Sequence, residues 1–256
     1  MPAFKLPKLH GEIPTEKNII YFSCDEKYYN SYGIALIKSI VYQIDWINVH
    51  CHVITKNTNI TFEEFPRTTH SYEIIDQKFL DSIPFEDTSP IGKYGLIVTP
   101  EILYYSCARF MQVDKIFNTY QHILQVDCDS ILHQPIPQEQ FLWATSTPRA
   151  MYKPKSPDKI IASIVSFGSG QTGNNFRKTL SQALFNLFSK NAYWYIDQVV
   201  LKKEFDKIQF EPLPFMWNSW NLKKNDAFFK TAKGNKKFKE NFVNEVNNWK
   251  NYVQRS

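Results

Sequence analysis

Short apolar runs of strand length alternate along this chain with segments whose apolar residues recur at helical spacing. Residues 18–24 (NIIYFSC) predict a strand, and residues 31–44 (SYGIALIKSIVYQI) predict the helix after it. Two further strands are expected at residues 49–55 and 71–76. A strand, a helix and a strand in this order begin a βαβ unit, which implies a parallel sheet covered by helices.

The later part of the chain continues this alternation. Thr99, Pro100 and Glu101 are typical of a helix start, with Thr99 as the N-cap and proline in the first turn. Residues 123–126 (ILQV) are expected to form the next strand. A further strand is expected at residues 160–167, with helices near residues 176–188 and 196–205. The pattern therefore predicts an α/β fold.

Two carboxylates, Asp127 and Asp129, interrupt the apolar run of residues 123–132 (ILQVDCDSIL). Burying an ionised carboxylate without a partner costs several kcal/mol, which is on the order of the net stability of a domain. In open α/β sheets, ligands bind at the carboxyl ends of the strands, and this pair follows such an end. Two hard oxygen donors suit Mg²⁺ or Mn²⁺, and a turn could bring both onto one cation. The alternative is a pair of solvated turn carboxylates.

Two metal-dependent chemistries use an acidic pair after a strand. The stretch DCDSI fits the opening motif of haloacid-dehalogenase phosphatases, in which the first aspartate is a nucleophile. That family places the motif near the N-terminus and needs a later acidic pair, for which this sequence has no convincing candidate. The other chemistry is sugar transfer from a nucleotide donor, with the metal bridging the carboxylates and the diphosphate.

Composition limits the class of protein. The chain has 256 residues, 43% of them hydrophobic, which is enough for a full core. No apolar stretch approaches the roughly 18 to 20 residues of a membrane span. Residues 1–17 lack an apolar signal core and are expected to form an irregular arm. The four cysteines are far apart without a CxxC pair, which favours reduced thiols in a cytoplasmic protein.

The net charge of +5 is unevenly distributed. Residues 222–256 hold nine Lys and Arg against three Asp and Glu, which gives +6 and leaves −1 for the rest. Such a run is usually a solvated face, and it can also bind phosphate, nucleic acid or an anionic membrane surface. No nucleic-acid partner is expected here, whereas peripheral membrane contact through this segment stays open.

Residues 109–129 (RFMQVDKIFNTYQHILQVDCD) resemble glycosyltransferase family 8, the glycogenin-like and bacterial lipopolysaccharide glucosyl- and galactosyltransferases. In this family an Arg-led helix runs into a strand that ends in D-x-D. Four other blocks match in the same order. They are CDEKYYNSYGIALIKSI from Cys24, FGSG at residues 167–170 with Gly168 in place of Asn, IDQVVL from Ile196, and LPFMWN at residues 213–218. The resemblance spans about residues 19–237.

The resemblance implies a GT-A fold, a single α/β domain with a mixed, mostly parallel central sheet flanked by helices. It divides the chain into the arm (residues 1–17), a catalytic domain (18–221) and a basic C-terminal segment (222–256) that closes the donor site. The implied reaction is metal-dependent and anomer-retaining. It moves a hexose from a nucleotide sugar, UDP-glucose or UDP-galactose, to an acceptor such as a glycan, a lipid-linked sugar or a protein.

The same resemblance assigns the donor site. Asp25 and Tyr28 fall on the positions that hold the nucleotide base, although an aromatic residue after a strand is core at least as often. Arg109 is expected to pair with a carboxylate of the site, and a surface ion pair is its alternative. Asp127 and Asp129 would hold the cation, with Cys128 between them in the donor-binding turn.

The reacting end of the site is assigned in the same way. Asp197 and Gln198 would contact the sugar and the acceptor, with Gln198 near the far face of the reacting carbon. Lys237 would add positive charge at the diphosphate, and Gly234 would let backbone N–H groups approach phosphate. The family ends in H-x-x-G-x-x-K, and here the stretch TAKGNKK places Thr231 where the metal-binding His should be. Because a hydroxyl is a poor ligand for Mn²⁺, this departure weakens the expected metal site.

The sequence leaves two alternatives to a glycosyltransferase. A sugar nucleotidyltransferase needs a glycine-rich N-terminal loop, and residues 1–32 contain only Gly11. A non-catalytic relative that binds a nucleotide sugar or a glycan is favoured by Thr231.

Overall fold

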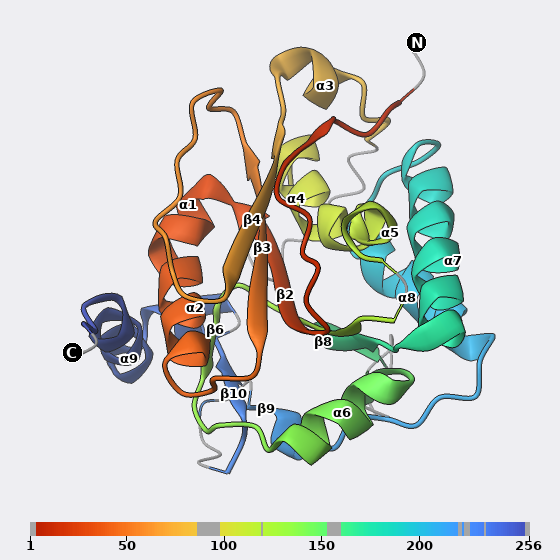
Figure 1. The fold of residues 1–256 in the computed structure, drawn as a ribbon. Coiled ribbons are helices and arrows are strands. Elements are labelled where there is room, and N and C mark those ends of the chain that lie inside the picture. Colours follow the sequence, from red (N-terminus) through yellow and green to blue (C-terminus); the bar gives the residue numbers. More distant parts are fainter. Residues whose placement is uncertain are drawn as a thin grey trace.

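A seven-stranded sheet forms the centre of the molecule. The computed structural model describes residues 4–85, 98–118, 120–152, 160–219, 222, 226–232 and 234–253. The strands of the central sheet are β1 (Leu9–Gly11), β2 (Asn18–Asp25), β3 (Asn48–Thr55), β4 (Thr68–Ile74), β5 (His122–Val126), β7 (Pro148–Tyr152) and β8 (Ile160–Phe167). Their spatial order is β1-β4-β3-β2-β5-β8-β7. Helices cover both faces of the sheet, which confirms the predicted α/β class (Figure 1).

The sheet is mixed. Strands β4, β3, β2 and β5 run parallel to one another. Strand β8 runs antiparallel to β5, and β7 runs antiparallel to β8. The centre of the sheet is buried on both faces, as expected for parallel strands, and β8 is buried along its whole length. The predicted mixed, mostly parallel sheet is therefore confirmed.

Helices are present at the predicted places, near residues 31–44, 99–111, 176–188 and 196–205, and others that were not predicted lie before, between and after them. The helices are α1 (Glu26–Tyr28), the π-helical turn η1 (Tyr29–Gly33), α2 (Ile34–Val41), α3 (Gln77–Asp81), α4 (Pro100–Met111), α5 (Val113–Ile116), α6 (Gln138–Ser146), α7 (Gly170–Phe188), α8 (Ile196–Asp206) and α9 (Glu240–Lys250). Thr99 caps α4 as predicted, because its side chain accepts a hydrogen bond from the backbone N–H of Ile102 at 3.2 Å. Helix α7 begins six residues before its predicted start, since residues 170–175 (GQTGNN) carry no apolar face.

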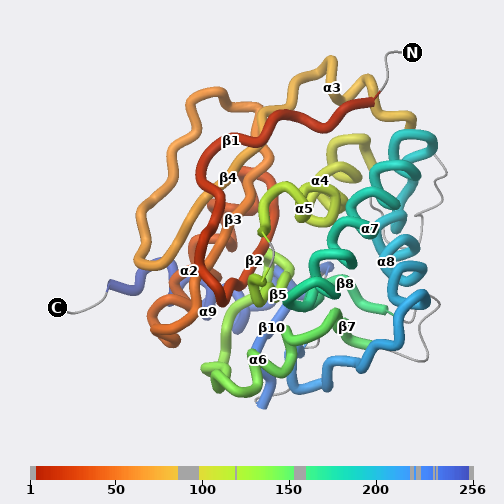
Figure 2. Tube along the Cα trace, turned by 45° about the vertical axis from the view of Figure 1, so that its right-hand side comes forward, coloured from red at the N-terminus to blue at the C-terminus, as the bar shows by residue number. Residues whose placement is uncertain are grey.

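Two apolar layers lie on opposite faces of the sheet. One contains Phe110, Leu180 and Phe205, which come from α4, α7 and α8. The other contains Leu36 of α2 and Phe141 of α6. Figure 2 shows α4, α5 and α7 to one side of the sheet and α2 and α9 to the other. Because both faces are covered by helices, a ligand reaches the sheet at the carboxyl edge of its parallel strands.

A small second sheet brings the C-terminal segment to the end of β5. It consists of β6 (Ser130–Leu132), β10 (Phe229–Thr231) and β9 (Asn218–Ser219), in the order β6-β10-β9. Two 3₁₀ turns flank these strands, η2 (Phe215–Trp217) and η3 (Gly234–Phe238). Helix α9 then packs against α2, where the Lys38 ammonium donates to the Lys250 carbonyl at 2.7 Å.

The N-terminal arm differs from its prediction. Residues 1–17 were expected to be irregular, but they contain β1, which pairs antiparallel with β4, and Phe4 is buried in the core. A three-residue edge strand is too short to show an alternating pattern, so the sequence did not reveal it. Within the described part of the chain, no helix has the length and apolar character to cross a lipid bilayer.

Candidate active site

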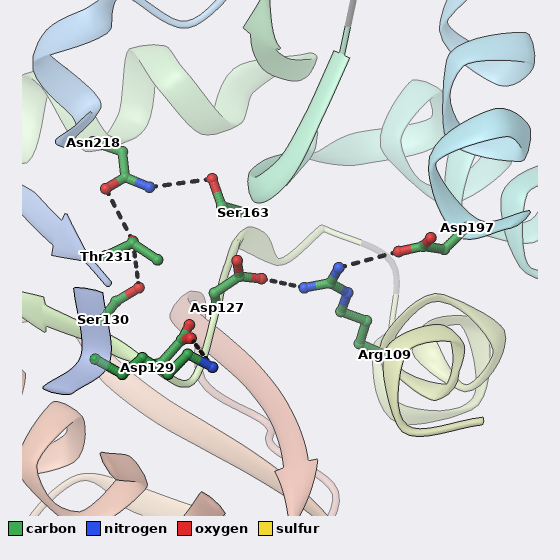
Figure 3. Close-up of polar contacts among 9 residues, drawn as sticks. Arg109, Asp127, Asp129, Ser130, Ser163, Asp197, Asn218 and Thr231 are labelled. Atoms are coloured by element: carbon green, nitrogen blue, oxygen red, sulfur yellow. Dashed lines mark hydrogen bonds and ion pairs between the residues drawn. The ribbon is translucent and has the colours of Figure 1, made fainter. Parts of the chain in front are cut away.

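The first carboxylate of the D-x-D turn is held by an arginine. Asp127 directly follows β5, and its backbone N–H donates to the Ser163 carbonyl of β8 at 2.9 Å. The guanidinium of Arg109, on α4, donates through Nη1 to Asp127 Oδ1 and through Nη2 to Asp197 Oδ2, the latter at 3.2 Å. Figure 3 shows Arg109 between these two carboxylates. The structure therefore joins α4, the end of β5 and the start of α8 through one side chain.

Opposite charges meet within this nearly enclosed group, in which one guanidinium serves two carboxylates. Burial by itself would lower the pKa of Arg109, but Asp127 and Asp197 together raise it above its usual value. Burial raises the pKa of Asp197, whose side chain is only 6% exposed, and Arg109 opposes that shift. Arg109 is therefore a permanent cation at this position.

The second carboxylate of the turn pairs with a lysine from the C-terminal segment. Lys237 Nζ, in η3, lies 2.6 Å from Asp129 Oδ2 and donates to the Tyr28 hydroxyl at 2.8 Å. The same ammonium lies 4.5 Å from the centroid of the Tyr28 ring. Burial alone would lower the pKa of Lys237, but Asp129 and Tyr28 raise it above its usual value. Each carboxylate of D-x-D thus contacts a cation of the chain.

The residues assigned to the nucleotide base lie beside this turn. Asp25 is the last residue of β2 and caps α1, where its carboxylate accepts from the Tyr28 backbone N–H at 2.7 Å. Burial raises the pKa of Asp25. The Cys128 thiol donates to the Tyr28 carbonyl at 3.6 Å, and Cys128 itself is buried. Burial also raises the pKa of Cys128, which keeps it a thiol.

Thr231 belongs to a buried chain of hydrogen bonds. Its hydroxyl donates to Asn218 Oδ1 at 2.9 Å and lies 2.7 Å from the Ser130 hydroxyl. Asn218 Nδ2 donates to the Ser163 hydroxyl at 3.1 Å, as Figure 3 shows. The sequence singled out Thr231 and placed Asn218 in a motif, but it did not indicate Ser130 or Ser163. Their contacts depend on strands far apart in the sequence.

The residues present fit a hard divalent cation only in part. Asp127 and Asp129 supply carboxylate oxygens, which are the donors that Mg²⁺ and Mn²⁺ prefer. The Thr231 hydroxyl, fully buried, is already committed to Ser130 and Asn218. Among the described residues, no group of three or more His, Cys, Asp and Glu side chains is placed to hold a metal ion. The remaining ligands would therefore have to be water and phosphate oxygens of the donor.

The other assigned positions lie on the surrounding elements. Gln198 is half-buried in the first turn of α8, next to Asp197. Gly234 begins η3 with φ of +58°, where a left-handed backbone favours glycine. Gly168 has φ of +76°, and a Cβ atom there would lie 2.7 Å from the backbone nitrogen of Pro148. This close approach and the positive φ favour glycine at residue 168.

Three solved glycosyltransferase structures are similar in fold to this chain. WbbM, a bifunctional glycosyltransferase, matches with a TM-score of 0.60 and 15% identity over 95% of this chain. The chain has the fold of these enzymes. GlyE, a glycosyltransferase of Streptococcus pneumoniae, matches with a TM-score of 0.58, 12% identity and 93% coverage. The galactosyltransferase LgtC, solved with donor and acceptor sugar analogs, also gives 0.58, with 11% identity and 93% coverage.

The match to these glycosyltransferase structures differs in extent. The chain spans 51% of WbbM and 61% of GlyE, so it corresponds to about half to two thirds of those two proteins. It spans 97% of the LgtC chain. No family model and no curated protein matches the sequence. At these identities the likeness is one of fold, and it confirms the GT-A fold that the family resemblance implied.

Proposed function

We propose that this chain is a glycosyltransferase that moves a hexose from a nucleotide sugar to an acceptor. The observation that carries the proposal is the convergence, at the carboxyl end of β5, of the D-x-D carboxylates with Arg109 and Lys237. Ligand sites of open α/β sheets lie at this edge. The glycosyltransferase fold and the order of the sequence motifs support the same reading.

The donor is proposed to be a UDP-hexose, UDP-glucose or UDP-galactose. Asp25 and Tyr28 would hold the base, because they lie at the end of β2 next to the D-x-D turn. Lys237 would bind the diphosphate, where its ammonium opposes the negative charge that grows as the glycosidic bond breaks. Gly234, at the start of the same turn, would let the backbone approach phosphate.

The proposed cofactor is Mn²⁺ or Mg²⁺, held by Asp127 and Asp129. When bound, such an ion would supply Lewis-acid stabilisation of the departing diphosphate. Arg109 fixes the direction of Asp127 by holding it against Asp197. Asp197 and Gln198 would contact the transferred sugar and the acceptor, with retention of the anomeric configuration. A glutamine in the active site of LgtC, replaced by glutamate in one solved structure, supports this role for Gln198.

A non-catalytic nucleotide-sugar or glycan-binding protein is the second candidate. The observation in its favour is that Thr231, at the position of the family histidine, is enclosed in a hydrogen-bonded network. Turnover of the donor separates the two functions, because only the transferase releases UDP from a nucleotide sugar.

The acceptor and the location are also proposals. A glycan, a lipid-linked sugar or a protein could each accept the hexose. Cytoplasmic location remains the prediction from the cysteines, and all four are free and buried. Peripheral membrane contact would use the basic segment 222–256, in which Phe238 and Val253 are exposed. The most direct binding test is thermal unfolding with UDP, ADP or GDP in the presence of Mn²⁺.

If the proposal is correct, UDP should stabilise the protein more than ADP or GDP does. A ligand at about 100 times its Kd stabilises a protein by about 2.7 kcal/mol. The Asp127→Asn variant should lose the effect. Equal stabilisation by all three nucleotides, or none with any of them, would contradict a UDP-sugar site.

A further inference from the structure

Lys237 occupies a carboxylate that the proposed cation would need. Its ammonium lies 2.6 Å from Asp129 Oδ2, and the Tyr28 hydroxyl accepts a hydrogen bond from it at 2.8 Å. The other carboxylate, Asp127, is paired with Arg109. In the protein without ligand, therefore, each carboxylate of D-x-D is already paired with a cation of the chain.

The cation and the ammonium cannot share Asp129 without repulsion. A divalent ion bound to this carboxylate would stand within a few ångströms of a full positive charge, in a site where the Lys237 side chain is only 17% exposed and screening by water is reduced. Metal binding therefore requires Lys237 to leave Asp129. A donor diphosphate offers the ammonium a new anionic partner in the same site.

Of the two paired cations, Lys237 is the one able to change partner. Arg109 bonds to two carboxylates on two different elements, Asp127 after β5 and Asp197 on α8, so its release would leave both unpaired. Among the described residues, Lys237 pairs with one carboxylate, that of Asp129, and it does so through a flexible four-carbon stem. It lies in η3, a short turn that begins at Gly234 and leads into α9.

We propose that Lys237 exchanges partners during donor binding. It neutralises Asp129 in the free protein and moves to the diphosphate when the cation takes its place. Cation and nucleotide then each favour binding of the other, by the same factor in both directions. The inference rests on the proposed function and adds a coupling between the two ligands that the protein creates with one side chain.

The test is titration of Mn²⁺ by calorimetry, with and without UDP, for the wild type and Lys237→Met. If Lys237 exchanges partners, its removal should change the affinities for Mn²⁺ and for UDP in opposite directions. Without UDP, the variant should bind Mn²⁺ more tightly, by roughly fivefold or more, because the Lys237 ammonium no longer competes with the cation for Asp129. With saturating Mn²⁺, it should bind UDP at least about tenfold more weakly, since the phosphate loses its ammonium.

Lys239→Met is the matched control. Lys239 lies two residues further along and is exposed, so its removal deletes the same charge outside the site. Both affinities should stay within about twofold of the wild type in this variant, as screening predicts for an exposed charge. Lys237→Gln repeats the test if Lys237→Met does not fold, as judged by circular dichroism.

The results separate a failure of the proposed exchange from a failure of the proposed function. If UDP and Mn²⁺ bind cooperatively to the wild type but Lys237→Met leaves the affinity for Mn²⁺ alone unchanged or lowers it, the exchange is wrong and Lys237 only binds phosphate. If the wild type does not bind UDP with any divalent cation, the proposed function itself fails.

Discussion

Asp127 and Asp197 lie on different elements and share one guanidinium, that of Arg109. Nη1 of Arg109 pairs with Asp127 and Nη2 lies 3.2 Å from Asp197. The arrangement fixes the start of α8, and with it Gln198, relative to the D-x-D turn. Stability and donor binding are therefore expected to depend on the same side chain.

Arg109→Met should lower the free energy of unfolding by about 3–5 kcal/mol at pH 7, because the buried carboxylate of Asp197 and the partly exposed carboxylate of Asp127 both lose their cation. Burial already raises the pKa of Asp197, and removal of Arg109 should raise it further. A carboxyl group whose pKa is raised in the folded state lowers stability only at pH values where that group is ionised in the unfolded chain. The loss should therefore be largest at pH 7 and shrink toward pH 4, as measured by urea denaturation.

The control for Arg109→Met is Lys202→Met, which breaks the exposed pair between Lys202 and Asp206 on α8. This change should alter stability by less than about 0.5–1 kcal/mol. Adding Asp197→Asn to Arg109→Met should restore part of the loss. A loss below about 1 kcal/mol that does not vary with pH would show that Arg109 is not the main partner of these carboxylates.

Asp127→Asn and Asp129→Asn should each abolish metal-dependent donor binding and leave the protein folded. In Asp127→Asn, Arg109 keeps its contact with Asp197, and in Asp129→Asn the Lys237 ammonium keeps the Tyr28 hydroxyl. Stability should therefore change by about 1 kcal/mol or less, as for partly exposed ion pairs. UDP affinity with Mn²⁺, measured by calorimetry, checks the prediction. Unchanged affinity in both variants would exclude D-x-D as the metal site.

Thr231→His should restore a protein ligand if this position lies beside the cation. Neutral imidazole coordinates and imidazolium does not, so the gain in Mn²⁺ affinity should be present at pH 8 and fade below the histidine pKa of about 6.5. The buried site must accept a larger side chain, at a cost of about 1–3 kcal/mol in stability.

Thr231→Val is the control for that variant, since it breaks the bonds to Ser130 and Asn218 without adding a ligand. It should destabilise the protein by about 1–3 kcal/mol and leave Mn²⁺ affinity unchanged. If Thr231→His binds Mn²⁺ no better than Thr231→Val at pH 8, Thr231 is not at the metal, and the role assigned to Lys237 through the same motif is lost.

Acid sensitivity should come partly from His70. This residue of β4 stacks on Phe62, with ring centroids 4.5 Å apart, and Nε2 lies 3.2 Å from the Tyr29 hydroxyl. Burial lowers the pKa of His70 to about 4. Between pH 6.5 and 4 the unfolded chain therefore binds more protons than the folded protein. The contribution of neutral His70 to stability should be fully present above pH 6.5 and should be lost as the pH falls through this window.

The stability lost through His70 over this pH window is expected to be about 1–3 kcal/mol, after a discount for the partial exposure of the side chain. His70→Gln should therefore lose less stability than the wild type between pH 6.5 and 4, as followed by urea midpoints. Burial also lowers the pKa of His50, so part of the acid sensitivity should persist. Identical pH profiles for the two proteins would contradict this assignment.

The sequence predicted the elements that carry a strong pattern. Strands β2, β3 and β8 are strand-length runs rich in apolar residues, and α4 begins with an N-cap followed by proline. It did not predict β1, β6, β9 or β10, which have two or three residues each, and it also missed the five-residue strand β7. Nor could local pattern place β5 beside β2 or reverse β8, since pairing depends on the packing of the whole sheet.

The candidate site was likewise predicted only in part. The D-x-D turn and the residues of the family motifs were identified from the sequence, and the structure brings Tyr28, Asp129 and Lys237 together. That these residues bind a donor stays a prediction. The sequence could not show that Asp127 and Asp197 share Arg109, because that contact depends on how α4 and α8 pack.

Release of UDP from a nucleotide sugar tests the central claim most directly. The wild type, incubated with UDP-glucose or UDP-galactose and Mn²⁺, should release UDP even through slow transfer to water. The rate should fall at least about a hundredfold without divalent cation or in Asp129→Asn, as expected when electrostatic stabilisation of the leaving group is removed. Tight binding of UDP-hexoses without any release of UDP, in the presence of Mn²⁺ and a panel of sugar acceptors, would contradict the transferase and favour the non-catalytic binding protein.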